Sequence, residues 1–110
     1  DIHSLVHCTG GGQTKVLHFI DELKIIKDNL LPTPPLFQAI QRESGTSWQE
    51  MYKVFNMGQR MEVYLPESKA QQLIAIASRF DIEAQVIGRV ESSKVKEVQI
   101  ISSHGTFKYQ

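Results

Sequence analysis

Three consecutive glycines, Gly10, Gly11 and Gly12, constrain the fold of this chain more than any other feature. An apolar stretch, residues 2–8, leads into them, and a helical pattern begins near Thr14. Because glycine has no Cβ, such a loop can adopt positive φ and let a ligand approach its backbone closely. A strand, a glycine loop and a helix N-terminus together point unpaired N–H groups at one spot, which suits a phosphate or another oxyanion. The alternative is a tight strand-to-helix turn, because the loop matches neither G-x-G-x-x-G nor a P-loop.

Composition and charge favour one ordinary globular domain over residues 1–110. The chain is 41% hydrophobic and 22% charged, and twelve basic residues balance twelve acidic ones. A net charge of zero gives no global field that would attract nucleic acid or an anionic membrane, so neither partner is expected. No apolar run approaches the ~20 residues that span a bilayer.

The single cysteine, Cys8, cannot form an internal disulfide, which fits a reducing compartment and a cytoplasmic location. A metal site is not expected, because His3 and His7 would lie about 13 Å apart on a strand that rises ~3.3 Å per residue. Adding His18 to that set produces no metal-ligand spacing such as CxxC or HExxH. Cys8 is therefore expected to be a small buried residue.

Strands and helices alternate along the chain. Strands are predicted over 2–8, 23–26, 61–65, 84–90, 95–101 and 106–109, and helices over 14–20, 34–45, 47–55 and 68–80. Because the two types are interspersed and the end is hairpin-like, we expect an α+β fold with helices packed on a mixed or antiparallel sheet.

Local signals sharpen four of these elements. Thr14 and Thr33 are predicted N-caps, and Ser47 and Ser68 each fit a capping box. The predicted helix 47–55 carries a mostly aromatic stripe at i, i+3, i+4, i+7 spacing, which is typical of a buried face: Trp48, Met51, Tyr52 and Phe55. Apolar and polar residues alternate over 61–65, which predicts a half-buried strand in which Met61, Val63 and Leu65 share one face. The clearest amphipathic helix is 68–80, with an apolar face formed by Ala70, Leu73, Ile74, Ala77 and Phe80.

Few side chains in the sequence are candidates for catalysis or for binding an anion. His7 stands just before the glycines and can donate to a phosphate or act as a general acid or base, or it can simply hold strand and loop hydrogen bonds. Lys15 lies in the first turn after the loop, where it is a candidate anion contact or a solvated lysine. Asn56 is expected at a helix end or turn, with Gly58 in the left-handed conformation.

Two separated segments resemble one known family together. His7-Cys8-Thr9-Gly10-Gly11-Gly12 resembles the His-x-Thr-Gly-Gly-Gly motif of aminoimidazole ribonucleotide synthetase, the phosphoribosylformylglycinamidine cyclo-ligase family. The segment 50–61 resembles that family's Glu-Met-Tyr-x-x-Phe-Asn-x-Gly-x-Gly-Met. Further matches are Pro34-Pro35-Leu36-Phe37 and the "Ile-Gly" strand at Val86-Ile87-Gly88-Arg89-Val90. Order and spacing agree over about residues 3–91.

The resemblance implies a C-terminal domain of a two-domain enzyme, α+β with partial ferredoxin-like topology. Such an enzyme uses ATP and Mg²⁺ to activate the formamide oxygen of formylglycinamidine ribonucleotide, and an internal amine then closes the imidazole ring. The upstream N-terminal domain would carry most ATP and metal contacts and form the homodimer. Taking the residue-level candidates and the resemblance together, we expect phosphate or substrate contacts on Thr9, Gly10, Gly11, Gly12, Lys15 and Asn56, with His7 as the catalytic candidate.

The chain departs from the family pattern after the glycines. Where Glu-Asn-Leu-Pro-Arg is usual, Val16 replaces the asparagine, His18 the proline and Phe19 the arginine, and Arg60 replaces a later glycine. Lys15, His18 or Arg60 are hypothesised to supply the lost positive charge. Two alternatives stay open: another ATP-using relative (selenophosphate synthetase, thiamin-monophosphate kinase or the hydrogenase-maturation carbamoyl dehydratase), or a binding module without catalysis.

Overall fold

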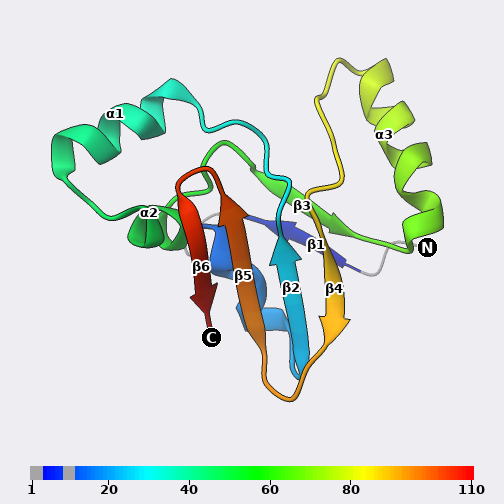
Figure 1. The fold of residues 1–110 in the computed structure, drawn as a ribbon. Helices are drawn as coiled ribbons and strands as arrows, with labels where there is room; N and C mark the ends of the chain where they lie inside the picture. Colours follow the sequence, from blue (N-terminus) through cyan, green and yellow to red (C-terminus); the bar gives the residue numbers. More distant parts are fainter. Residues whose placement is uncertain (1–3, 9–11) are drawn as a thin grey trace.

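The computed structural model describes residues 4–8 and 12–110, apart from the side chains of Ser4 and His18, and over them the chain is an α+β fold (Figure 1). The elements alternate in the predicted order. They are β1 Ser4–His7, η1 Gly12–Phe19, β2 Leu23–Lys27, α1 Pro35–Ser44, α2 Trp48–Val54, β3 Met61–Tyr64, η2 Glu67–Lys69, α3 Ala70–Arg79, β4 Gly88–Ser92, β5 Glu97–Ser102 and β6 Gly105–Tyr109, where η marks a 3₁₀ helix. The predicted fold class is confirmed.

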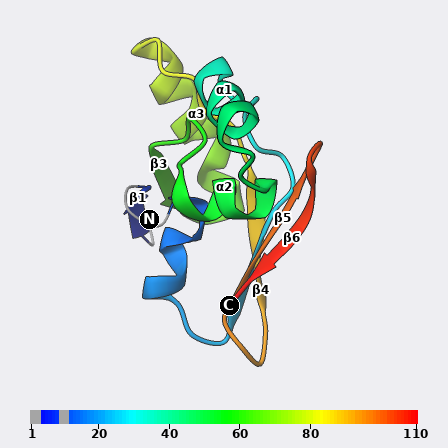
Figure 2. The same cartoon turned by 90° about the vertical axis from the view of Figure 1, so that its left-hand side faces the viewer.

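The strands form two sheets. The larger has the order β4-β2-β5-β6 and is mixed, because β2 pairs parallel with β5 and the other neighbours are antiparallel. The smaller is an antiparallel ribbon of β1 and β3. In Figure 2 the larger sheet is seen nearly edge-on, and the ribbon and the helices lie to one side of it. The core therefore sits between the inner face of this sheet and the elements that cover it.

Alternation along the strands explains what the inner face presents. Val98 and Ile100 of β5 are fully buried, and they pair with Tyr109 and Phe107 of β6. From α2, Met51 and Tyr52 are buried against this core, as the aromatic stripe predicted. The hydroxyl of Tyr109 donates to the carbonyl of Gln49 at 2.6 Å, which fixes α2 over the β5–β6 hairpin.

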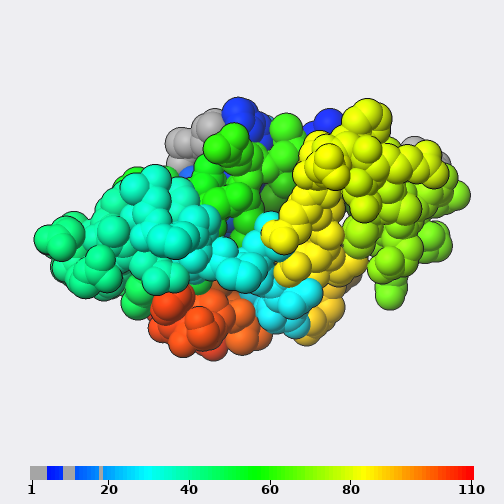
Figure 3. All heavy atoms as spheres, turned by 90° about the horizontal axis from the view of Figure 1, so that it is seen from above, coloured from blue at the N-terminus to red at the C-terminus, as the bar shows by residue number. Residues whose placement is uncertain are grey.

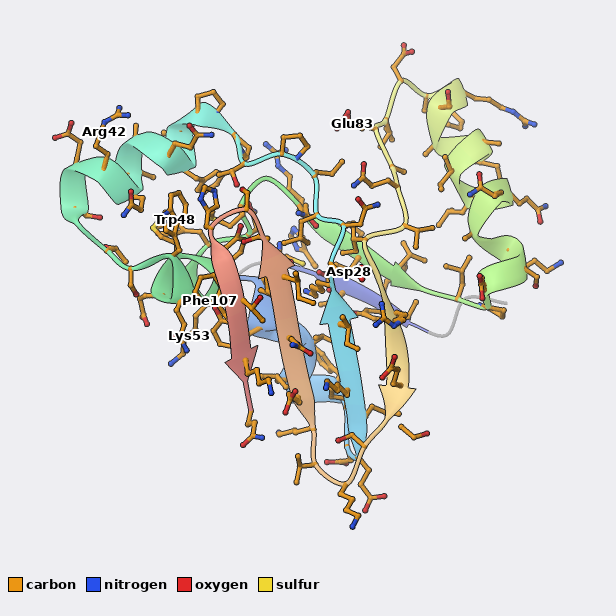
Figure 4. The ribbon with its side chains drawn as sticks, viewed as in Figure 1. Asp28, Arg42, Trp48, Lys53, Glu83 and Phe107 are labelled. Carbon is orange, nitrogen blue, oxygen red and sulfur yellow. The ribbon has the colours of Figure 1, made fainter. Side chains whose placement is uncertain are left out.

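The same hairpin receives the aromatic end of α2. The Trp48 ring stacks on His104 with a centroid distance of 3.7 Å and an interplanar angle of 9°. Tyr52 meets Phe107 at 6.0 Å between ring centroids. Figure 4 shows Trp48 and Phe107 on α2 and β6 at this end of the sheet. These contacts fix the position of the turn that follows α2.

Three predicted caps are wrong. The helix after the glycines begins at Gly12 instead of being capped by Thr14, and it is 3₁₀. Within this helix, the carbonyl of Gln13 also accepts from the side chain of Lys27, a partner outside the helix. Thr33 does not cap α1, whose N-cap is Pro34 with no side-chain hydrogen bond, and Ser68 lies inside η2 instead of capping α3.

Ser47 does cap α2, as predicted. Its hydroxyl accepts from the backbone N–H of Glu50 at 3.3 Å. The helix runs to Val54 and ends with the extended residue Phe55. This cap fixes where α2 begins, and the length of the helix then sets where the following turn falls.

The buried face of β3 is the reverse of the predicted one. Glu62 is buried and Met61 is 55% exposed. The alternation itself is real, but the inward position is taken by a carboxylate because Lys27 supplies a buried partner for it. Sequence period alone does not reveal which face of a two-stranded ribbon turns inward.

The remaining differences between the sequence predictions and the structure concern residues 84–90 and α3. Residues 84–87 are not strand, because the carbonyl of Ile87 accepts from the backbone N–H groups of Asp28 and Asn29 instead of a strand partner. Figure 4 shows Asp28 at the end of β2, beside the start of β4. Helix α3 forms as predicted, but none of its residues is buried. Of the helices within residues 4–8 and 12–110, none is long and apolar enough to cross a membrane.

Candidate functional site

The glycine loop ends against the turn that follows α2. Gly12 has φ +50°, and a Cβ placed on it would lie 2.3 Å from the carbonyl oxygen of Phe55. No side chain fits in that space, so glycine is required both by the backbone conformation and by the contact. The two segments that resemble the cyclo-ligase motifs, 43 residues apart along the chain at Gly12 and Phe55, are therefore in direct contact.

The start of the loop is held by the same segment. The backbone N–H of Cys8 donates to the carbonyl of Arg60 at 2.7 Å, immediately after His7 pairs with Met61 in the β1–β3 ribbon. Residues 9–11 thus connect two points, Cys8 and Gly12, that are both anchored on residues 55–60.

A buried polar network lies behind the loop. The ammonium of Lys27 donates to Glu62 Oε2 at 2.5 Å, to the Gln13 carbonyl at 2.7 Å and to Gln13 Oε1 at 3.0 Å. The Gln13 amide donates in turn to the carbonyl of Asn56 at 2.6 Å. Lys27 and Glu62 are an ion pair with side chains only 1% and 4% exposed, so their charges compensate each other in a region that excludes water.

Two further titratable groups border this network. Burial, followed by the charge of Glu62, raises the pKa of the Cys8 thiol to about 11, so the thiol is protonated at neutral pH. The Tyr64 hydroxyl donates to Glu62 Oε1 at 2.9 Å, and burial together with that carboxylate raises the pKa of Tyr64 above its ordinary range. Neither group is an activated nucleophile, which confirms the expectation that Cys8 is a small buried residue.

The turn at 56–58 has its own support. Asn56 Oδ1 accepts from the N–H of Gly58 at 2.8 Å, and Met57 and Gly58 both have positive φ, of 56° and 94°. A Cβ on Gly58 would lie 2.6 Å from a ring carbon of Pro34, so the proline segment packs on this turn. The carboxamide oxygen of Asn56 thus serves the turn, as a turn residue was expected to do.

Gly88, from the fourth segment of the resemblance, is another position where the backbone leaves no room for a side chain. A Cβ on it would lie 1.9 Å from the carbonyl oxygen of Ile26 on β2. Because Lys27 is the next residue of β2, this close approach of β4 lies beside the residue at the centre of the buried network. Of the other three resembling segments, residues 50–61 contact the glycine loop at Gly12, the proline segment packs on the 56–58 turn, and the segment of Gly88 packs on β2.

The predicted site residues are only partly brought together. His7 is exposed on the outer face of β1, and Lys15 is half-buried on η1, where its charge acts on Cys8. Thr9, Gly10 and Gly11 lie outside the described residues. Arg60 is exposed and adjoins the start of the loop through its carbonyl, whereas Val16 is buried at 2% exposure.

The residues that sequence reasoning missed are Gln13, Lys27 and Glu62. The only signal for Lys27 was a lysine that closes the apolar run of β2, and Glu62 looked like the polar half of an alternating strand. A buried pair of this kind is recognised only when both partners are placed together in three dimensions.

No dedicated metal site is formed in the described part. Over 4–8 and 12–110, no three His, Cys, Asp or Glu side chains are grouped to hold an ion. Two shallow hollows, of about 380 and 360 Å³, lie at the ends of the larger sheet, and neither is lined by His7, Lys15 or Asn56. The described residues therefore do not fit a Mg²⁺ ion, and we assign them no step through one.

Comparison with known proteins places the chain in a family. Residues 1–101 match the family described as AIR synthase related protein, C-terminal domain. The chain belongs to this family. It is 39% identical over 93 residues to a phosphoribosylformylglycinamidine cyclo-ligase of Methanocaldococcus jannaschii, which covers 84% of this chain and 27% of the relative.

Other relatives carry the same name. One from Methanococcus vannielii is 37% identical over 93 residues, and one from Methanopyrus kandleri is 29% identical over 94 residues. They cover 84% and 86% of this chain, and 27% of each relative. The chain thus spans about a quarter of the length of the curated relatives it matches.

Proposed function

We propose that this chain is the C-terminal domain of an ATP-dependent phosphoribosylformylglycinamidine cyclo-ligase of purine biosynthesis, and that its glycine loop binds phosphate. The observation that carries the proposal is the contact between Gly12 and Phe55, because it joins the two segments that resemble that enzyme. Membership of the family and relatives bearing the cyclo-ligase name support it.

The chemistry assigned to this chain is electrostatic. Backbone N–H groups of Gly10, Gly11 and Gly12 bind the phosphate oxygens of a nucleotide or ribonucleotide, and Lys15 adds positive charge beside them. His7, exposed at the end of β1, donates to the same anion or exchanges a proton with substrate. Because phosphoryl transfer depends mainly on positioning and charge stabilisation, a loop anchored at both ends suits this role.

The rest of the enzyme lies outside these 110 residues in the proposal. An N-terminal domain binds ATP and Mg²⁺, forms the homodimer and closes over the loop, in a cytoplasmic enzyme. The isolated 110 residues are therefore expected not to catalyse ring closure.

The test uses the full-length protein. ADP release is measured with formylglycinamidine ribonucleotide, and with selenide and thiamin monophosphate as comparison substrates. The proposal expects release with the first alone, and its loss in Gly11→Leu. Gly45→Ala is the control, since Gly45 is a glycine of positive φ with nothing within 4 Å of its Cβ position.

One observation favours a second candidate, a divergent enzyme or a domain that binds without catalysing. Val16 occupies the place of the family's asparagine and is buried at 2% exposure, so this position offers no polar contact to a ligand. In the same assay, release with selenide or thiamin monophosphate instead would assign another ATP-using relative. Phosphate-ligand binding with no ADP release from any substrate would favour the binding module.

A further inference from the structure

The buried ion pair of Lys27 and Glu62 is the least expected feature of the molecule. The ammonium of Lys27 has three acceptors and 1% side-chain exposure, and the carboxylate of Glu62 accepts from both Lys27 and Tyr64. Taking two charges out of water is costly, and an apolar pair of similar volume is often as stable or more so. Stability alone therefore does not account for charges at this place.

The network connects the parts that surround the glycine loop. Glu62 pairs with Val6 on β1, the strand that leads into the loop. Gln13 is the first residue after the three glycines and the second residue of η1, and its backbone carbonyl accepts from Lys27 at 2.7 Å. The Gln13 side chain bridges onward to the carbonyl of Asn56 at 2.6 Å. Lys27 thus links the strand before the loop, the residue after it and the turn beside it.

We propose that Lys27, Glu62 and Gln13 are positioning residues, which hold the exit of the glycine loop so that its N–H groups converge on the phosphate. None of the three touches the ligand. An ammonium is suited to this task because it donates in three directions, to a side-chain carboxylate, a side-chain amide and a backbone carbonyl together. Charge-assisted hydrogen bonds are short and directional, so they fix the backbone of Gln13 more tightly than apolar packing does.

The surroundings of the pair support this role. Lys27 occupies the inner face of β2, paired with Ile100 of β5, and Gly88 lies opposite it on β4. A Cβ on Gly88 would collide with the carbonyl oxygen of Ile26, so the backbones of β4 and β2 lie close together at this position. The base of the lysine is therefore fixed, and only its ammonium end reaches the loop.

The test uses the full-length protein and rests on the proposed function only in its activity arm. The double variant Lys27→Met/Glu62→Leu removes both charges at once, so neither is left unpaired. Lys24→Met is the matched control, because Lys24 lies on the same strand but its contact with Glu97 is 3.7 Å long and its side chain is 30% exposed. Hydrogen exchange of a peptide spanning residues 8–16 is measured beside thermal unfolding and steady-state kinetics.

We expect faster exchange over residues 9–13 in the double variant, together with a lower thermal midpoint, because the buried carbonyl of Gln13 and the hydroxyl of Tyr64 each lose a partner. We expect kcat/KM for ATP or the ribonucleotide to fall about 100-fold, which is the loss expected when the bound reactant is displaced by the order of 1 Å. Lys24→Met should match the wild type in both measurements. A folded double variant with wild-type exchange and kinetics would overturn the proposal.

If the double variant does not fold, Gln13→Ala decides. It removes the bridge to Asn56 while the pair of Lys27 and Glu62 remains, and the same faster exchange is expected. Unchanged exchange in Gln13→Ala would also overturn the proposal. Should the wild-type protein release no ADP with any substrate, the proposed function fails, while the exchange measurement still decides whether these residues hold the loop.

Discussion

Helices α2 and α3 lie in the same chain but differ in what holds them. On α2, Met51 is completely buried and Tyr52 is nearly so. The helix is fixed to β6 because the carbonyl of Gln49 accepts from the hydroxyl of Tyr109. α3 buries no residue, and its end leaves Ile76 and Phe80 exposed by 41% and 71%. From above, α1 and the segment of α3 occupy opposite ends of the molecule (Figure 3). The elements around the glycine loop therefore form a tightly packed half, and α3 a loosely attached one.

The contrast concerns function as well as packing. The packed half holds Gly12, Gln13 and the 56–58 turn in one arrangement, which the proposed phosphate-binding role of the loop would require. The segment after α3 stands away from the sheet, with Glu83 at its outer end (Figure 4). Positions in the first half should therefore be far less tolerant of change than equivalent positions in the second.

The largest effect is expected at the loop. Gly12→Ala should destabilise the chain by about 4 kcal/mol, because the new Cβ would meet the backbone of Phe55 at positive φ. Gly45→Ala, with φ +71° and open space, should cost about 1 kcal/mol. Urea unfolding followed by Trp48 fluorescence measures both. Equal costs at the two glycines would mean that the Gly12 contact is not the constraint we describe.

The next effect compares the helices directly. Met51→Ala on α2 should lose about 2–5 kcal/mol, because it empties a fully buried site. Ile76→Ala on α3 should lose less than about 1 kcal/mol, because that side chain is already 41% exposed. The midpoints of the same urea transitions report the difference. A cost at Ile76 as large as at Met51 would show that α3 is packed in solution.

A smaller effect depends on pH. The folded state raises the pKa of Cys8 from 9.0 to about 11, so above pH 9 the unfolded chain loses a proton that the folded chain keeps. Stability should be unaffected by this group below pH 9 and should fall as the pH rises toward 11. Tyr64 and Tyr109, whose pKa values are also raised by burial, extend the fall to higher pH.

Cys8→Ala isolates that contribution. The free energy of unfolding of the variant should decline less steeply between pH 9 and 11 than that of the wild type, whatever its stability at pH 7. Parallel curves for the two proteins would contradict the burial of the thiol beside Glu62.

The smallest effect concerns the caps. Ser47→Ala should cost about 1 kcal/mol, because it removes the acceptor for the N–H of Glu50. Ser68→Ala should change stability by less than about 0.5 kcal/mol, because α3 has no side-chain cap. Thermal unfolding of both variants makes the comparison, and a larger loss at Ser68 would place a cap at η2 that the structure lacks.

The sequence allowed the element order and the α+β class to be predicted, because local period and breakers determine both. It also identified Met51 and Tyr52 as core, since only burial explains that spacing on α2. For α3 the same kind of spacing predicted an apolar face correctly but did not reveal whether anything covers it. Amphipathicity is a property of one helix, whereas burial depends on the partner.

The sequence predicted a candidate site at the glycines, of which the structure describes Gly12, but it did not indicate the buried network of Gln13, Lys27 and Glu62 beside them. Gly12 was recognisable because the backbone itself demands glycine there, and the resemblance placed Phe55 and Asn56 in the same motif. Glu62 and Lys27 were not, because each looks like an ordinary polar residue at a strand position, and their meaning arises only from a contact between residues 35 apart. Side chains that act through tertiary partners leave no local pattern.

The most direct test of this account is a nucleotide titration of the full-length protein labelled with ¹⁵N-glycine. Variants assign the amide signals of Gly10, Gly11, Gly12 and Gly45. We predict that ATP or the ribonucleotide substrate shifts the three loop signals and leaves Gly45 unmoved. Saturation of the protein by either ligand with all three loop signals unchanged would contradict the assignment of this loop as its phosphate site.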